Sequence, residues 1–102
     1  MPIIYNVTLN VDHAIASEWL KWMKSVHIPD VMRTGMFSDY RILRLLGDED
    51  SGGLTFAVQY TCPDMDAYKQ YLEVFAPKLQ AEHTARFKDK FDPFRTLLEV
   101  VE

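Results

Sequence analysis

The chain has 102 residues, of which 48% are apolar, 13% aromatic and 25% charged. This length allows one domain, and the composition excludes a disordered chain, a collagen-like repeat and a coiled coil. The net charge is −4, from 11 basic and 15 acidic residues, and the basic residues are scattered along the sequence. We therefore expect one globular domain over residues 1–102 that does not bind nucleic acid.

Several other classes are excluded by what the sequence lacks. Cys62 is the single cysteine, so an intramolecular disulfide and a multi-cysteine metal motif are both excluded. No signal-peptide pattern and no long apolar run occur, which predicts a cytoplasmic protein without membrane contact. The three histidines are dispersed and no cofactor fingerprint is present, so we expect neither a metal nor a cofactor.

The first quarter of the chain predicts a strand followed by a helix. Apolar residues alternate with polar ones over residues 3–11, which is typical of a strand with one buried face. Asp12 is a plausible N-cap. The apolar residues after it recur at helical spacing and are Ile15, Trp19, Trp22, Met23 and Val26.

A proline predicts where this helix ends. Pro29 disfavours helical geometry at the residue before it, so the helix should end near His27. A short helical turn over residues 30–34 should follow, capped by Gly35.

The middle of the chain reads as a hairpin. Residues 37–46 and 54–61 predict two strands, joined by a turn over residues 47–53. The turn contains Asp48, Glu49 and Asp50, which we interpret as solvated rather than as a calcium loop, because the twelve-residue ligand pattern is missing.

The last part of the chain predicts a helix and a strand. The helix opens at Pro63-Asp64 and closes at Asp92-Pro93, and Pro77 must kink or split it. A final strand is predicted over residues 95–101. The expected apolar stripe of the helix consists of Tyr68, Leu72, Phe75, Leu79, His83, Phe87 and Phe91.

The element order β-α-β-β-α-β predicts an α+β fold, the ferredoxin-like plait, with a four-stranded antiparallel sheet and two helices on one face. The opposite sheet face is then uncovered, and its eight positions on the central strands carry no charge. These are Ile4, Asn6, Thr8, Asn10, Thr55, Ala57, Gln59 and Thr61. A sheet face washed by solvent usually carries charged residues, so we predict that this one pairs with a second copy in a homodimer.

Four residues are candidates to line a ligand pocket between helices and sheet: Trp22, His27, Tyr60 and His83. A histidine on an apolar stripe could serve as acid, base or ligand anchor, but a core histidine bonded to a backbone carbonyl is the simpler interpretation of His83. The simpler interpretation of His27 is a cation near a helix C-terminus, and that of Trp22 is core packing. The hydroxyls of Tyr5 and Tyr60 need a partner or a ligand.

Arg95 is a further candidate, because a guanidinium can hold a carboxylate through two hydrogen bonds. Glu99 lies four residues further along the same predicted strand, and an ion pair between the two is the simpler interpretation.

The whole chain resembles a known family. The segments that carry the likeness are Ile4-Tyr5-Asn6-Val7-Thr8, Trp22-Met23, His27-Ile28-Pro29, Val31-Met32, Thr34-Gly35, Gln59-Tyr60, Phe94-Arg95-Thr96 and Glu99-Val100. The chain looks like a short bacterial family of unknown function that is similar to the dimeric α/β-barrel superfamily. That superfamily includes cofactor-independent monooxygenases, small isomerases, haem-dependent enzymes and ligand-sensing domains, so the resemblance implies fold and dimerisation rather than one activity.

Three functions remain open from the sequence. The first is a homodimeric domain that binds a small organic molecule between helices and sheet. The second is a cofactor-independent monooxygenase or isomerase in which His27 or His83 acts as general base. The third is a structural or protein-interaction module without a ligand.

Overall fold

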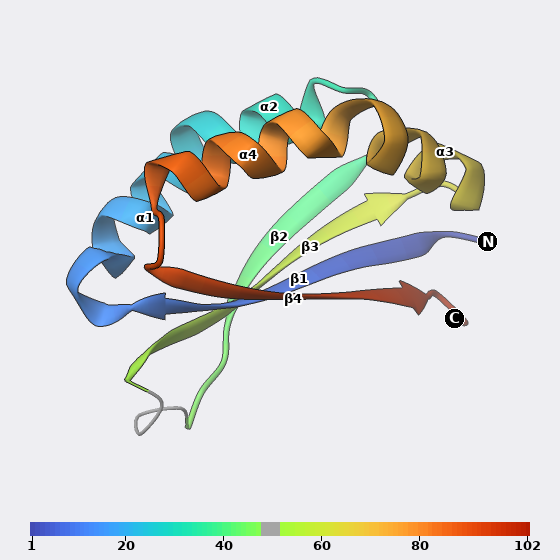
Figure 1. Ribbon diagram of the computed structural model, residues 1–102. Helices are drawn as coiled ribbons and strands as arrows, with labels where there is room; N and C mark the ends of the chain where they lie inside the picture. The colour runs from blue at the N-terminus through green and yellow to red at the C-terminus, as the bar shows by residue number, and fades with distance from the viewer. Residues whose placement is uncertain (48–51) are drawn as a thin grey trace.

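A computed structural model describes residues 1–47 and 52–102, so the predicted acidic turn at 48–50 lies outside the described residues. One layer of helices arches over one face of a twisted sheet (Figure 1). In chain order the elements are β1 (Ile3–Asp12), the 3-10 turn η1 (His13–Ile15), α1 (Ala16–Trp22), the π-turn η2 (Met23–His27), α2 (Ile28–Met32), β2 (Asp39–Arg44), β3 (Gly53–Cys62), α3 (Met65–Gln70), the π-turn η4 (Tyr71–Phe75), α4 (Ala76–Arg86) and β4 (Phe91–Glu99).

The sheet is antiparallel in the order β2-β3-β1-β4, which confirms the predicted ferredoxin-like βαββαβ fold with the first and third strands central. Tyr5 of β1 lies opposite Tyr60 of β3 and Leu97 of β4. Odd-numbered residues of β1 face the helices, and even-numbered ones face away. The alternation in sequence therefore corresponds to the two faces of the sheet.

The first helical segment does not end at His27 as predicted. It continues through η2 into α2, and Ile28 is helical at φ −62° and ψ −44°. The backbone N–H of Ile28 donates to the carbonyl of Met23, five residues back. This widened turn places Pro29 in the first turn of α2, where a missing N–H costs little. The predicted cap is confirmed: Gly35 has φ +79° and its N–H donates to the Met32 carbonyl.

The second helical segment also has a π-turn before a proline. The π-turn η4 precedes Pro77, which lies in the first turn of α4. The extra residue in the π-turn rotates the helix face, so Tyr71 is buried at 3% exposure and Leu72 is 38% exposed. The predicted stripe is therefore wrong at Leu72. It is also wrong at Phe91, because α4 ends at Arg86 and Phe91 begins β4.

The two edge strands differ from their predicted bounds. β2 spans only Asp39–Arg44, and β4 begins at Phe91, four residues before the predicted start. Pro93 lies within β4 opposite Leu9. A proline is tolerated there because an edge strand does not need every backbone N–H for pairing.

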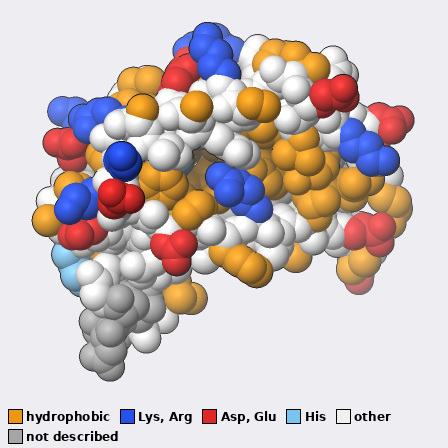
Figure 2. Space-filling view, viewed as in Figure 1, with side chains coloured by type: hydrophobic (Ala, Val, Ile, Leu, Met, Phe, Trp, Pro, Cys, Tyr) orange, Lys and Arg blue, Asp and Glu red, His pale blue; other side chains and the backbone are white. Residues whose placement is uncertain are grey.

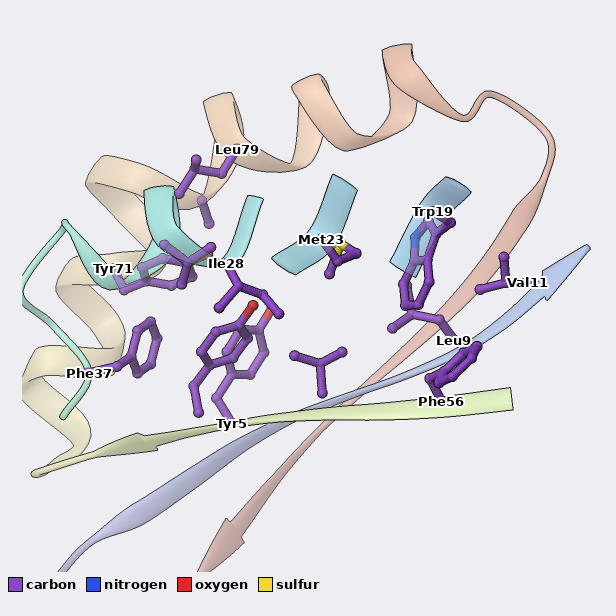
Figure 3. Close-up of a cluster of buried hydrophobic side chains, with 14 of the residues drawn as sticks. Tyr5, Leu9, Val11, Trp19, Met23, Ile28, Phe37, Phe56, Tyr71 and Leu79 are labelled. Atoms are coloured by element: carbon purple, nitrogen blue, oxygen red, sulfur yellow. The ribbon is translucent and has the colours of Figure 1, made fainter. Parts of the chain in front are cut away.

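The core lies between the helical layer and the sheet. Trp19 is fully buried, and its ring lies 5.1 Å from that of Phe56. Tyr5 points from β1 toward the helical layer, and Met23 points from η2 toward the sheet (Figure 3). Among the described residues, the helices are too short or too polar to span a bilayer.

Candidate functional site

A hollow lies between the sheet and the two π-turns. It has a cavity volume of about 30 Å³ and is open to solvent on one side. This volume has room for about two water molecules. Figure 2 shows an opening between the helices and the sheet, bordered by hydrophobic side chains with a basic one beside it. The lining residues are Tyr5, Val7, Leu9, Met23, His27, Val58, Tyr60, Tyr71, Gln80, His83 and Arg95.

Three of the four residues predicted to line a pocket are brought together here. His27, Tyr60 and His83 lie in its wall, and Trp22 does not. The Trp22 ring instead stacks on both histidines, with ring centres 5.3 Å from that of His27 and 5.6 Å from that of His83. Trp22 therefore supports the imidazoles without lining the hollow.

The π-turns supply part of this wall. Met23 and His27 are the first and last residues of η2, and Tyr71 is the first residue of η4. A π-turn adds one residue to a helical turn. It therefore rotates the side chains that follow it away from the positions they would have in a regular α-helix. The two widened turns therefore determine which side chains of the helical layer reach the hollow.

His83 is held by an indole rather than by a backbone carbonyl. The buried Nε1–H of Trp19 donates to Nε2 of His83 over 2.9 Å, and the Phe91 ring stacks on the imidazole at 4.0 Å. Burial, then His27 and Arg95, lower the pKa of His83 to about 3. His83 is therefore neutral at pH 7, and because Nε2 accepts a hydrogen bond, its proton lies on Nδ1.

His27 is also neutral at pH 7. Burial lowers its pKa to about 4, against the smaller opposing effect of Asp30. Its ring centre lies 5.1 Å from that of His83. The interpretation of His27 as a cation at a helix end is wrong, because the helix continues to Met32 and the imidazole is uncharged.

Three tyrosine hydroxyls border the hollow. Tyr5, Tyr60 and Tyr71 are each 3% exposed, and the Tyr5 ring lies about 6 Å from the other two. Burial raises the pKa of Tyr60 and Tyr71, so both phenols keep their protons. Within residues 1–47 and 52–102, none of the three hydroxyls has a hydrogen-bond partner. None of the three oxygens is among the fully buried atoms without a partner in this part of the chain, so these hydroxyls are available to water or to a ligand in the hollow.

Arg95 is the charged residue of the lining. It is exposed and lies opposite Val7, on the face of β4 that carries the helices. The predicted ion pair with Glu99 is wrong, because four residues along a strand span about 13 Å. Among the described residues, the ion pairs join Arg33 to Asp30 and Arg86 to Glu18.

Tyr71 and Gln80 line the hollow but were not predicted from the sequence. Tyr71 follows Tyr68 by three residues, and Gln80 precedes His83 by three, so helical spacing was a usable signal for both. The described part of the chain contains no group of three His, Cys, Asp or Glu side chains close enough to hold a metal ion.

Comparison with known proteins supports the fold. Residues 2–101 match the family model described as Domain of unknown function (DUF4286). No curated protein is detectably similar to the chain.

Several solved structures share the architecture. SnoaB, a cofactor-independent oxygenase from Streptomyces nogalater, is 13% identical with a TM-score of 0.73, over 99% of this chain and 94% of SnoaB. A dimeric ferredoxin-like protein from an uncultured marine organism is 6% identical with a TM-score of 0.76, over 99% and 96%. An ethyl tert-butyl ether D (EthD) family protein from Bacillus halodurans is 12% identical with a TM-score of 0.70, over 97% and 99%. At these identities the likeness shows the fold alone.

Proposed function

This chain belongs to the Domain of unknown function (DUF4286) family, and we propose that it binds a small organic molecule in the hollow between its helices and its sheet. The observation that carries the proposal is the set of unpartnered hydroxyls of Tyr5, Tyr60 and Tyr71 around an internal space. None of the three hydroxyl oxygens is among the fully buried unpaired atoms of the described residues, so each remains accessible within the hollow, where water or a ligand can pair it.

The two histidines strengthen this proposal. Their stacking on Trp22 and the hydrogen bond from Trp19 orient both imidazoles, so the polar groups of the wall are held in place before a ligand arrives. Preorganised polar groups in a mostly apolar wall are typical of small-molecule sites.

Filling the hollow tests the proposal. Val7 is half-buried in the wall, and Val7→Phe would place a ring in the space. The matched control is Ile42→Phe, a half-buried position on the same sheet face that does not line the hollow. Small planar fragments should shift backbone amide NMR signals around the hollow in wild type and in Ile42→Phe, and not in Val7→Phe.

Two results would contradict binding in the hollow. One is unchanged fragment binding in Val7→Phe, and the other is the absence of any binding fragment. The second result would favour a structural or protein-interaction module.

Catalysis as a cofactor-independent oxygenase or isomerase is the second candidate. SnoaB shares the fold, and the hollow holds two imidazoles. His27 is the better candidate base, because Nε2 of His83 already accepts a hydrogen bond. Yet burial lowers the pKa of His27 to about 4, which makes it a weak base at neutral pH. The geometry therefore supports binding more strongly than proton abstraction.

We also propose that the protein forms a homodimer through the uncovered sheet face. The amide nitrogen of Asn6 donates to the hydroxyls of Thr8 and Thr96, while its Oδ1 is buried without a hydrogen-bond partner among the described residues. The exposed apolar residues Leu43, Phe94 and Leu98 lie on the same face, by their register with β1 and β3. A neutral, partly apolar sheet can be covered by its own copy without burying unpaired charges. Two solved neighbours are described as dimeric ferredoxin-like proteins.

A further inference from the structure

The positive charge in the wall of the hollow indicates which chemical class of ligand the hollow can bind. We infer that the hollow takes a small planar carboxylate, with its negative charge toward Arg95. The inference rests on the proposed function and adds the chemical class of the ligand. Its basis is that the lining contains one guanidinium and no aspartate or glutamate.

Arg95 has the position of an anion-binding residue. It lines the hollow from β4, and among the described residues it forms no ion pair. Beside the larger effect of burial, its positive charge acts to lower the pKa values of His83, Tyr68 and Tyr71. The guanidinium is therefore close enough to these side chains to attract an anion in the hollow. A planar guanidinium can donate two parallel hydrogen bonds to a carboxylate.

The wall also contains neutral hydrogen-bond donors. The Trp19 indole occupies Nε2 of His83, which leaves Nδ1–H as the donor of this imidazole. The hydroxyls of Tyr60 and Tyr71 keep their protons at neutral pH. Because His27 and His83 are uncharged, the lining carries a net charge of about +1 from Arg95, which attracts a monoanion.

The rings in the wall favour a planar ligand of limited size. Tyr5, Tyr60 and Tyr71 present aromatic surface, against which a second ring can pack. The cavity volume of about 30 Å³ is well below the roughly 150 Å³ of a cavity that holds benzene, so a ring must also occupy the open side of the hollow. Met23 lies in the wall, and its unbranched thioether can change rotamer to admit a ring. The fitting ligand is therefore a carboxylate with a single ring.

Benzoate and benzamide test the inference, because they have nearly the same shape and differ in charge. Their affinities are measured by titration with NMR detection for wild type, Arg95→Gln and Arg44→Gln. Arg44 is exposed and does not line the hollow, so the control removes the same charge elsewhere. Benzoate should bind wild type and Arg44→Gln about tenfold more tightly than benzamide, and Arg95→Gln should remove that difference.

The results separate the inference from the proposed function. Equal affinities for the two probes, an unchanged preference in Arg95→Gln, or no benzoate binding would each overturn the carboxylate assignment. Those results leave binding in the hollow intact if neutral fragments still bind wild type and fail to bind Val7→Phe. Far-ultraviolet circular dichroism of Arg95→Gln verifies that the variant is folded, as expected for an exposed residue.

Discussion

His83, which is buried, and His27, which is half-buried, should make the protein sensitive to mild acid. Their pKa values are lowered to about 4 and about 3, against an ordinary value of 6.5 in the unfolded chain. Below pH 6.5 the unfolded state therefore binds protons that the folded state does not, and the free energy of unfolding falls as the pH falls. Stability from this source is complete above pH 6.5 and decreases by up to about 1.4 kcal/mol per pH unit for each histidine.

Urea unfolding between pH 7.5 and pH 5.5 measures this dependence. His27→Gln should reduce the slope, because one of the two titrating groups is gone. His13→Gln is the matched control and should leave the slope nearly unchanged, because His13 is exposed. A free energy of unfolding that stays level across this range would contradict the burial of neutral imidazoles.

At the scale of elements, the π-turns are the main departure from regular structure. Both precede a proline by two residues, at Pro29 and Pro77, and both lie over the hollow. In each case the widened turn relieves the clash between the proline ring and the carbonyl of an earlier turn. The same feature thus accommodates a proline within a helix and positions the side chains that line the site.

The helix register near η4 can be tested with two neighbouring residues. Tyr71→Ala should lower the free energy of unfolding by about 3 kcal/mol or more, because it removes a buried ring. Leu72→Ala should cost less than about 1 kcal/mol, because Leu72 is partly exposed. A regular α-helix with the predicted stripe gives the opposite order. Urea denaturation of the two variants at one pH decides between the registers.

The strands were predictable because their signal is local. The alternation from Ile3 to Val11 identifies the buried face of β1 residue by residue, and the acidic, glycine-rich segment predicts a hairpin. The π-turns were not predictable, because the preference of the residue before proline disfavours a helix at Ile28, and tertiary packing overrides it. The start of β4 was missed because a proline inside a strand is tolerated only at an edge, which depends on the strand order.

The lining of the candidate site was predictable in part for the same reason. His27, Tyr60 and His83 were identified from their positions on apolar faces, and those faces meet at the hollow. Trp22 was predicted to line the hollow but stacks on the two histidines behind it. An apolar stripe identifies the buried face of a helix, but not which side chain on that face reaches the hollow. The Trp19–His83 hydrogen bond joins residues 64 positions apart, and no local pattern contains it.

At the scale of the whole molecule, the two faces of the sheet differ in what covers them and in their side chains. One face supports the helices and the hollow, and the other carries neutral polar residues with exposed apolar ones among them. If two copies pair through the second face, the hollows lie on the outer sides of the two sheets and stay accessible. Dimerisation and ligand binding should therefore be separable by mutation.

Phe94 offers the sharpest test of the dimer. It is 67% exposed on the uncovered face, and Phe94→Glu would place a charge where a second sheet should pack. The matched control is Val74→Glu, which changes a 60% exposed apolar residue on the helical side. Light scattering after size exclusion should give twice 11.9 kDa for wild type and Val74→Glu, and 11.9 kDa for Phe94→Glu. A monomeric wild type, or a Phe94→Glu protein that stays dimeric, would show that this face is not the interface. The monomeric variant should still bind fragments in the hollow, because its core residues are unchanged.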